Sequence, residues 1–373
     1  MLTMDKNKLN EMLAEMVDRG SSDLFLKAGQ KPTVRVDGAI QFLEYMELNM
    51  EETESVPRIL LNETQLDEFR RTNEMDCAWG VRGLGRFRVN IYRQRGSTAA
   101  VFRYISNPNF SFEELCLPGA VRSLSEKRRG LVLVTGTTGS GKSTTLAAMI
   151  NHINSTRRCH IVTVEDPIEF LHQDETAIIS QREVGFDTAN FSEALRHVLR
   201  QSPDVILIGE MRDLETISTA INAAETGHLV LSTLHTIDTV QTVERIINYF
   251  PAYLHAQIRM ELGLSLQGVI CQRLLPMITG KGRIPAIEIM ISTPIIKKLL
   301  QEGKILELPQ HIEAGQHAGM QTFNQSLLQL YRSKKIRMED ALLYATSPDE
   351  FRLMAEGIAT GTRAKEMSGS YYR

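Results

Sequence analysis

Apolar positions recur every three or four residues near the start of the chain and then give way to short β-type runs. The first pattern predicts a helix that ends before Gly20, with a buried face formed by Leu9, Met12, Leu13, Met16 and Val17. Residues 25–26 and 33–36 are expected to be short strands, and a second helical pattern covers 63–71. The opening third of the chain therefore predicts a mixed α/β domain.

A β-hairpin is expected next, because apolar and polar residues alternate through 86–92 and a second run follows at 98–105. The two faces differ: one carries the apolar Phe87, Val89 and Ile91, and the other carries Arg86, Arg88 and Asn90. The arginine-bearing face is either a solvated face of the sheet or a surface that binds an anion.

The pattern of apolar and polar residues changes from residue 131 onward. Continuous apolar runs alternate with helical segments, at 131–134, 160–164, 205–208 and 229–232. Such runs predict parallel strands buried on both faces by crossover helices. Beyond about residue 290 the pattern is mainly helical. We therefore expect a first domain with its linker at 1–118, a second domain at 119–360, and a disordered tail at 361–373.

Composition narrows the class of protein. A chain of 373 residues with 42% hydrophobic and 23% charged residues predicts a globular protein of two domains. The net charge of −3 argues against a dedicated nucleic-acid binder, and the four cysteines form no CxxC pair that would predict a zinc site. The sequence has no signal-type leader and no long apolar run, so a cytoplasmic protein is expected.

The strongest chemical signal is the segment 136–144, GTTGSGKST, which matches the P-loop pattern GxxxxGK[ST] between a strand and a helix. Its glycines let backbone N–H groups approach phosphate oxygens, Lys142 supplies a positive charge, and the Ser143 hydroxyl suits Mg²⁺. ATP and Mg²⁺ are the expected cofactors. The expected nucleotide-binding residues are Gly136, Thr138, Gly139, Ser140, Gly141, Lys142, Ser143 and Thr144.

Three carboxylates are candidates for the hydrolytic step. Glu165 and Glu169 belong to the acidic segment TVEDPIEF, and Glu210 follows the apolar run 205–208. A carboxylate at the end of a parallel strand can hold Mg²⁺ with Ser143 or orient the attacking water. The spacing does not decide which of the three is the general base.

Two histidines, His228 and His235, bracket the apolar run 229–232. Their separation of seven residues is not a metal-ligand spacing on one helix face. They are either polar residues that terminate a strand or, beside a phosphate, a sensor of the nucleotide.

Taken in order, these motifs resemble the secretion ATPase superfamily and, within it, the type IV pilus retraction (twitching motility) ATPases. The resemblance covers about residues 5–355. It is carried by the P-loop, TVEDPIEF at 163–170, QREVG at 181–185, GEMRD at 209–213, AAETGHLVLSTLHT at 223–236, SSDLFLKAGQKPTVRVDG at 21–38, RGLGRFRVNIYRQRG at 82–96 and GMQTFNQSL at 319–327.

The resemblance implies a PAS-like domain followed by a RecA-like P-loop ATPase core, assembled as a homohexameric ring. It implies functional roles for Glu165, Glu169, Glu210, His228 and His235, and for arginines that act on the nucleotide of a neighbouring subunit. The matching arginines are Arg88 and Arg103, with Arg93 and Arg95 as weaker candidates. The implied partners are an inner-membrane pilus platform protein and a paralogous pilus ATPase, which would hold the ring at the cytoplasmic side of the inner membrane.

Two departures bear on the subfamily. The chain lacks the four-cysteine zinc element of extension ATPases, which favours retraction. The stretch 294–302, PIIKKLLQE, keeps the amphipathic pattern of the helix found in retraction ATPases but carries different charges. Principal and accessory retraction motors both fit. The rivals from other classes are a RecA-like nucleic-acid motor and a nucleotide-gated regulatory module.

Overall fold

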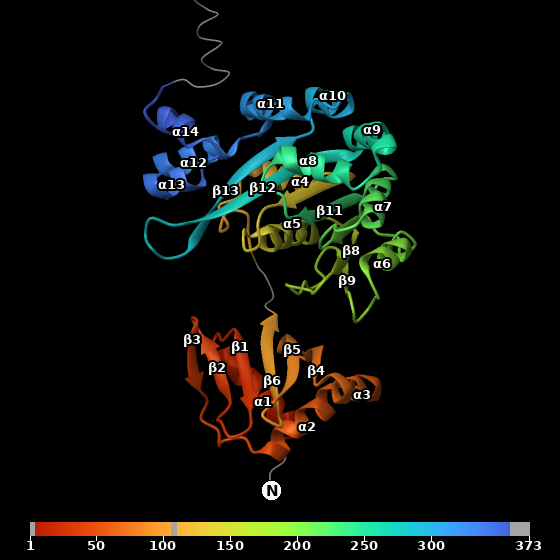
Figure 1. The fold of residues 1–373 in the computed structure, drawn as a ribbon, viewed down its shortest axis with the longest axis vertical. Coiled ribbons are helices and arrows are strands. Elements are labelled where there is room, and N and C mark those ends of the chain that lie inside the picture. The colour runs from red at the N-terminus through yellow and green to blue at the C-terminus, as the bar shows by residue number, and fades with distance from the viewer. Residues whose placement is uncertain (1–3, 106–109, 359–373) are drawn as a thin grey trace, which may run out of the picture. The chain divides into compact units, whose positions relative to one another are not determined.

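The computed structural model describes residues 4–105 and 110–358, so the tail expected at 361–373 lies outside the described residues. The chain divides into two compact units (Figure 1). One unit comprises the chain up to residue 107 together with Glu169–Leu171, and the other comprises the remainder from residue 108. Among the residues that the structure describes, no helix has both the length and the apolar composition needed to cross a membrane.

The first unit is an antiparallel sheet of six strands in the order β3-β2-β1-β6-β5-β4, with three helices. Its elements are α1 (Lys6–Asp18), β1 (Asp23–Lys27), β2 (Thr33–Val36), β3 (Ala39–Phe42), α2 (Met50–Leu60), α3 (Glu63–Thr72), β4 (Glu74–Val81), β5 (Gly85–Gln94) and β6 (Ser97–Ile105). The expected helices and hairpin are therefore present.

One face of this sheet forms the core of the first unit. Leu9, Met12, Leu13 and Met16 of α1 pack in one cluster with Phe87, Val89 and Ile91 of β5, so the alternation read from the sequence is confirmed. Arg95 and Gly96 join β5 to β6 with φ values of 48° and 78°. Two successive residues of positive φ are the geometry of a type I′ hairpin turn, which matches the twist of the strands that it connects.

The second unit contains a seven-stranded sheet in the order β13-β12-β7-β11-β10-β8-β9, parallel except for the β12–β13 pair. Its strands are β7 (Gly130–Thr135), β8 (His160–Glu165), β9 (Ile178–Glu183), β10 (Val205–Ile208), β11 (Leu229–Leu234), β12 (Leu266–Pro276) and β13 (Arg283–Ile291). The four apolar runs identified in the sequence are β7, β8, β10 and β11. Strands β9, β12 and β13 were not predicted from the sequence.

Helices cover both faces of this sheet (Figure 1). Along β7, Leu131 and Leu133 join one apolar cluster, whereas Val132 and Val134 join another on the opposite face. The helices are α4 (Gly119–Ser125), α5 (Lys142–Thr156), α6 (Phe191–Val198), α7 (Leu214–Glu225), α8 (Thr239–Asn248), α9 (His255–Ser265), α10 (Pro294–Glu302), α11 (Leu308–Ala314), α12 (Phe323–Arg332), α13 (Met338–Tyr344) and α14 (Pro348–Ala355), with short 3₁₀ turns η1 (Ala252–Leu254), η2 (Ile305–Glu307) and η3 (Gly315–Ala318).

The division between the units differs from the boundary expected at residue 118. Phe112 is buried in the apolar cluster of the second unit, and Leu115 and Leu117 pack against that cluster. The segment that the Pro-Gly signals marked as a linker is thus part of the second unit, because its apolar side chains are buried there.

We predict that Phe102→Ala will destabilise the first unit by about 3–5 kcal/mol, because the Phe102 side chain is 0% exposed and its removal leaves a cavity. Phe42→Ala is the matched control in the same sheet, since Phe42 is 60% exposed and should change stability by less than about 0.5 kcal/mol. Urea unfolding can be followed by the fluorescence of Trp79, the single tryptophan of the chain, which lies in β4. Equal effects of the two substitutions would contradict the assignment of the core.

Candidate active site

The P-loop occupies the turn between β7 and α5. Gly136, Gly139 and Gly141 have φ values of 145°, 77° and 92°, a region that residues with a Cβ rarely adopt. A Cβ on Gly136 would lie 2.5 Å from Ser140 Oγ and 2.6 Å from the carbonyl oxygen of Gln272. The loop therefore requires glycine at 136 both for its conformation and for the close approach of β12.

Lys142, the first residue of α5, folds back over this loop. Its Nζ donates to the carbonyl oxygens of Gly136 at 2.9 Å and Thr137 at 3.1 Å, and the residue is only 9% exposed. Thr138 and Gly139 lie exposed at the loop tip, while Ser143 and Thr144 are half-buried in the first turn of α5. The N-terminus of α5 and the ammonium group thus face the same loop, an arrangement suited to phosphate.

Parallel pairing brings the other candidates to the same edge of the sheet. Strands β7, β11, β10 and β8 are consecutive neighbours, and their carboxyl ends carry the P-loop, His235, Glu210 and Glu165. Gly209, just before Glu210, lies so close to β8 that a Cβ there would be 3.3 Å from Cα of Glu165. These candidates therefore form one row along the edge where ligands of open α/β sheets bind.

Glu210 contacts the side chains of Arg212 and His235. One carboxylate oxygen lies 2.8 Å from Nη2 of Arg212, and the other lies 3.3 Å from Nε2 of His235. Burial acts to raise the pKa of Glu210, but the Arg212 hydrogen bond and the charges of His235 and Arg212 outweigh it and lower that pKa. Glu210 is consequently an anion, at the side of a cavity of about 360 Å³ that His235 and Tyr249 also line.

Glu165 is oriented by neutral donors. The Thr163 hydroxyl donates to Glu165 Oε1 at 2.6 Å, and Gln181 Nε2 donates to the same oxygen at 3.3 Å. Gln181 is held in turn, because its Oε1 accepts the backbone N–H of His172 at 2.8 Å. The carboxylate of Glu165 therefore has a defined direction at the end of β8.

The sequence of the chain matches a known protein family. The family model described as Type II/IV secretion system protein matches residues 4–295. The chain belongs to this family. It is 45% identical to the type IV pilus retraction ATPase PilT of Pseudomonas aeruginosa, over 92% of this chain and 99% of PilT. It is 43% identical to the type IV pilus ATPase PilU of the same organism, over 93% of this chain and 91% of PilU.

A solved structure of the pilus retraction motor PilT with bound ADP matches the model with a TM-score of 0.84 and 44% identity, covering 94% of this chain and 99% of that one. The protein is therefore an ATPase of the pilus retraction type within the secretion ATPases, and it binds nucleotide. The expected fold class, a RecA-like ATPase core preceded by a smaller α/β domain, is confirmed.

Not every site residue expected for this ATPase lies at the catalytic edge. His228 precedes β11 and thus lies at the amino end of the strand whose carboxyl end carries His235. Its Nδ1 lies 2.9 Å from the carbonyl oxygen of Ala223, so the ring connects the end of α7 to β11. Within one chain, His228 does not join Glu210 and the P-loop, and its catalytic role stays a prediction.

The remaining candidates are exposed. Glu169 is exposed in the loop after β8, and Arg88 and Arg103 are exposed on β5 and β6 of the first unit. Arg93 is engaged internally, since its guanidinium pairs with Glu54 at 2.9 Å and stacks on Phe69. The functional roles of Glu169, Arg88 and Arg103 stay predictions.

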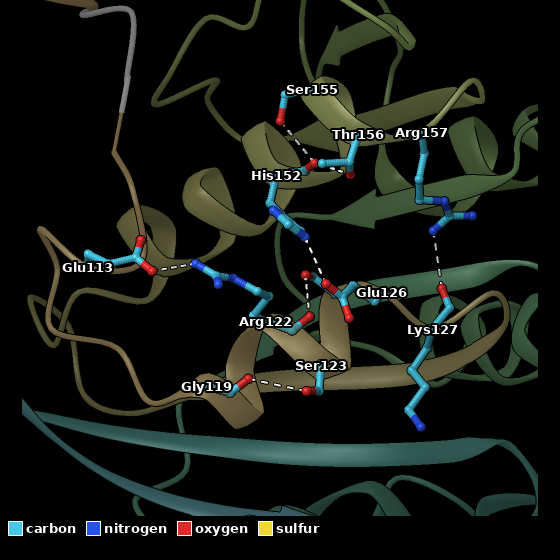
Figure 2. A network of polar contacts seen from close by, with 11 residues as sticks. Glu113, Gly119, Arg122, Ser123, Glu126, Lys127, His152, Ser155, Thr156 and Arg157 are labelled. Atoms are coloured by element: carbon cyan, nitrogen blue, oxygen red, sulfur yellow. Dashed lines mark hydrogen bonds and ion pairs between the residues drawn. The ribbon is translucent and has the colours of Figure 1, made fainter.

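A larger cavity, of about 690 Å³, lies at the opposite edge of the sheet, lined by residues that include Arg128, His152, Arg157 and Arg158. Figure 2 shows the polar network beside it, in which His152 of α5 faces Glu126 at the end of α4. Arg157 donates to the carbonyl oxygen of Lys127 at 3.2 Å. These contacts connect α4 and α5 at the amino ends of the strands, so cavity size alone does not locate the catalytic edge.

Several supporting residues of the ATPase site were not identified from the sequence. Arg212 stands two residues after Glu210 in a loop, a spacing with no periodic signal. Gln272 Nε2 donates to Thr145 Oγ1 at 2.8 Å and so connects β12 to α5. Glu288 of β13 accepts the backbone N–H and the hydroxyl of Thr239, which anchors the start of α8 shortly after His235. Burial raises the pKa of Glu288.

We predict that His172 makes the folded state sensitive to mild acid. Burial lowers its pKa from 6.5 to about 4, so between these values the unfolded chain binds a proton that the folded chain does not. The free energy of unfolding should therefore fall as the pH decreases from 7 to 5, with His172 contributing about 1–2 kcal/mol of the loss. His172→Gln should reduce the slope of stability against pH, measured by circular dichroism during urea unfolding.

The control for this prediction is His317→Gln, which removes an exposed imidazole from η3. This variant should retain the pH slope of the wild type. A slope that is unchanged in His172→Gln would show that His172 does not resist protonation in the folded state.

Proposed function

We propose that this ATPase is a ring-forming motor that uses ATP hydrolysis to retract a type IV pilus. The observation that carries the proposal is the row of groups at the carboxyl edge of the sheet, with Glu210 ionised between Arg212 and His235 and the P-loop two strands away. Such a row supplies the charges that phosphoryl transfer requires. The similarity to PilT over nearly the whole chain supports pilus retraction as the work performed.

The P-loop would bind the phosphates of ATP. Residues 136–141 present backbone N–H groups from a glycine-rich turn, and Lys142 Nζ already lies over the loop. The helix α5 adds the positive end of its dipole. These groups neutralise the β- and γ-phosphates and orient the γ-phosphorus for attack by water.

The donor set at this edge fits Mg²⁺. The Ser143 hydroxyl and the Glu210 carboxylate are hard oxygen donors of the kind that Mg²⁺ prefers, and the lowered pKa keeps Glu210 ionised. Ser143 and Glu210 would hold the ion, which when bound neutralises phosphate charge. His235 contacts Glu210 and so can respond to changes at that carboxylate.

One of the three carboxylates accepts the proton of the attacking water. Glu165 has a defined direction, since Thr163 and Gln181 both donate to it. Glu169 and Glu210 are the other two candidates. Positioning and charge contribute most to phosphoryl transfer, so more than one of these acids can affect the rate.

The assembly that we propose is a homohexamer at the cytoplasmic side of the inner membrane. Arg88 and Arg103 of one copy act on the nucleotide bound by the next, and hydrolysis drives rigid-body movement of the domains. The ring acts on an inner-membrane platform protein and drives pilin back into the membrane. A second candidate role is that of an accessory retraction ATPase, since the chain is nearly as similar to PilU, at 43% identity, as to PilT, at 45%.

Lys142→Ala should abolish ATP turnover, with a loss of at least about 100-fold in kcat/KM, because the phosphates lose their buried cation. Initial rates of phosphate release over a range of ATP concentrations, at saturating Mg²⁺, measure the effect. Lys127→Ala, which removes an exposed lysine just before β7, is the matched control and should retain wild-type turnover. Wild-type turnover in Lys142→Ala would refute the assignment of the nucleotide site.

Glu210→Gln should preserve ATP binding but lower kcat by about 10²–10³-fold, because it removes the negative charge without changing the shape of the side chain. Nucleotide binding by fluorescence and phosphate release separate the two effects. Glu215→Gln on α7 is the control, since Glu215 is exposed and should not affect either measurement.

The same substitution tests the biological role. Cells whose only copy of the protein carries Glu210→Gln should display extended pili that do not retract in live imaging. Cells without surface pili would indicate an extension motor and contradict the proposal. Normal pilus dynamics would also contradict it.

A further inference from the structure

The polar face of the first unit's sheet carries a row of charged residues across four neighbouring strands. Arg35 of β2 is paired in register with Asp23 of β1, Asp23 with Arg103 of β6, and Arg103 with Arg88 of β5. Side chains in register lie on the same face of a sheet. The row therefore holds three cations and one anion side by side.

Arg103 and Arg88 stand directly opposite each other, which is unfavourable for like charges. The compensating charge is Asp23, whose side chain is only 5% exposed although it lies on the polar face. Its Oδ1 accepts Arg103 Nε at 2.9 Å, and its Oδ2 accepts the Ser22 hydroxyl at 2.7 Å. Arg35 Nε lies 3.4 Å from Oδ2. The carboxylate is thus fixed from three sides.

Arg103 binds Asp23 through Nε and not through its terminal Nη groups. The bond to Asp23 uses Nε, at the base of the guanidinium group, and the side chain is 69% exposed. Within the described residues, the two terminal Nη groups of Arg103 make no hydrogen bond to the protein. The carboxylate therefore restrains the plane of the guanidinium while its fork of outer N–H groups stays available for an anion.

We propose that Asp23 is a positioning residue for Arg103, which it holds so that the outer N–H groups of Arg103, beside Arg88, meet the triphosphate bound by an adjacent copy of the chain. The inference rests on the proposed function, in which these arginines act on a neighbour's nucleotide. An ion pair whose cation is this exposed contributes little to folding stability, so stability alone does not account for the buried carboxylate.

Asp23 acts on the reaction only through Arg103, and the test is therefore a double-mutant cycle in the full-length protein, with kcat and KM for ATP as readouts. Arg103→Gln should lower kcat by about 10³-fold, as expected for loss of an arginine that contacts the transferred phosphoryl group. Asp23→Asn should lower kcat by about 10-fold with a change in KM below about 2-fold. In the Arg103→Gln background, Asp23→Asn should have no further effect.

The control variant is Asp67→Asn, which removes a carboxylate paired with Arg70 on the exposed side of α3 and should leave kcat unchanged. Trp79 fluorescence verifies that the first unit stays folded in each variant. Ser22→Ala is a second variant that keeps the charge of Asp23 but removes one bond that fixes it. It should lower kcat by about 2–3-fold, again only when Arg103 is present.

The outcomes separate this inference from the function on which it rests. A loss in Arg103→Gln without a loss in Asp23→Asn overturns the role of Asp23 and leaves the role of Arg103 intact. Equal losses from Asp23→Asn in the presence and absence of Arg103 show a structural role and also overturn the inference. Wild-type kcat in Arg103→Gln overturns both.

Discussion

Parallel pairing of β7, β11, β10 and β8 is the constraint on which the rest of the ATPase unit depends. Parallel strands end at the same edge, so strand pairing brings together residues that are separated by tens of positions in the sequence. The edge receives a phosphate loop from β7, an imidazole from β11 and carboxylates from β10 and β8. The helices that make these crossovers also bury both faces of the sheet, so the core and the site arise from one connectivity.

Both units contain a carboxylate of low solvent exposure that contacts two basic side chains. The basic side chains are more exposed than the carboxylates: Arg212 and His235 contact Glu210, and Arg35 and Arg103 contact Asp23. A buried anion needs such partners, because water can no longer solvate it. In the second unit the carboxylate lies in the row that includes the P-loop, whereas in the first unit the carboxylate accepts a hydrogen bond from the guanidinium of Arg103.

The sequence predicted the elements whose signals are local. The GxxxxGK[ST] loop, the four apolar strands and the alternating hairpin β5–β6 each have a periodic or positional signature, and the similarity to secretion ATPases placed them in one fold. Strands β12 and β13 were not predicted, although both are largely apolar, because an antiparallel pair added to a parallel sheet breaks the alternation of strand and helix. Arg212, Gln181 and Asp23 were not identified as site residues, because each contacts another site residue only in the folded chain.

The position of β7 within its sheet has a consequence for how the protein is made. This strand lies between β11 and β12, so its two neighbours are Leu229–Leu234 and Leu266–Pro276, whereas the sheet of the first unit is complete at Ile105. During synthesis the P-loop strand therefore leaves the ribosome long before either of its flanking strands exists. The nascent chain can acquire a folded first unit early, but β7 gains both of its neighbours only after Pro276 has been translated, which leaves an apolar strand exposed until then.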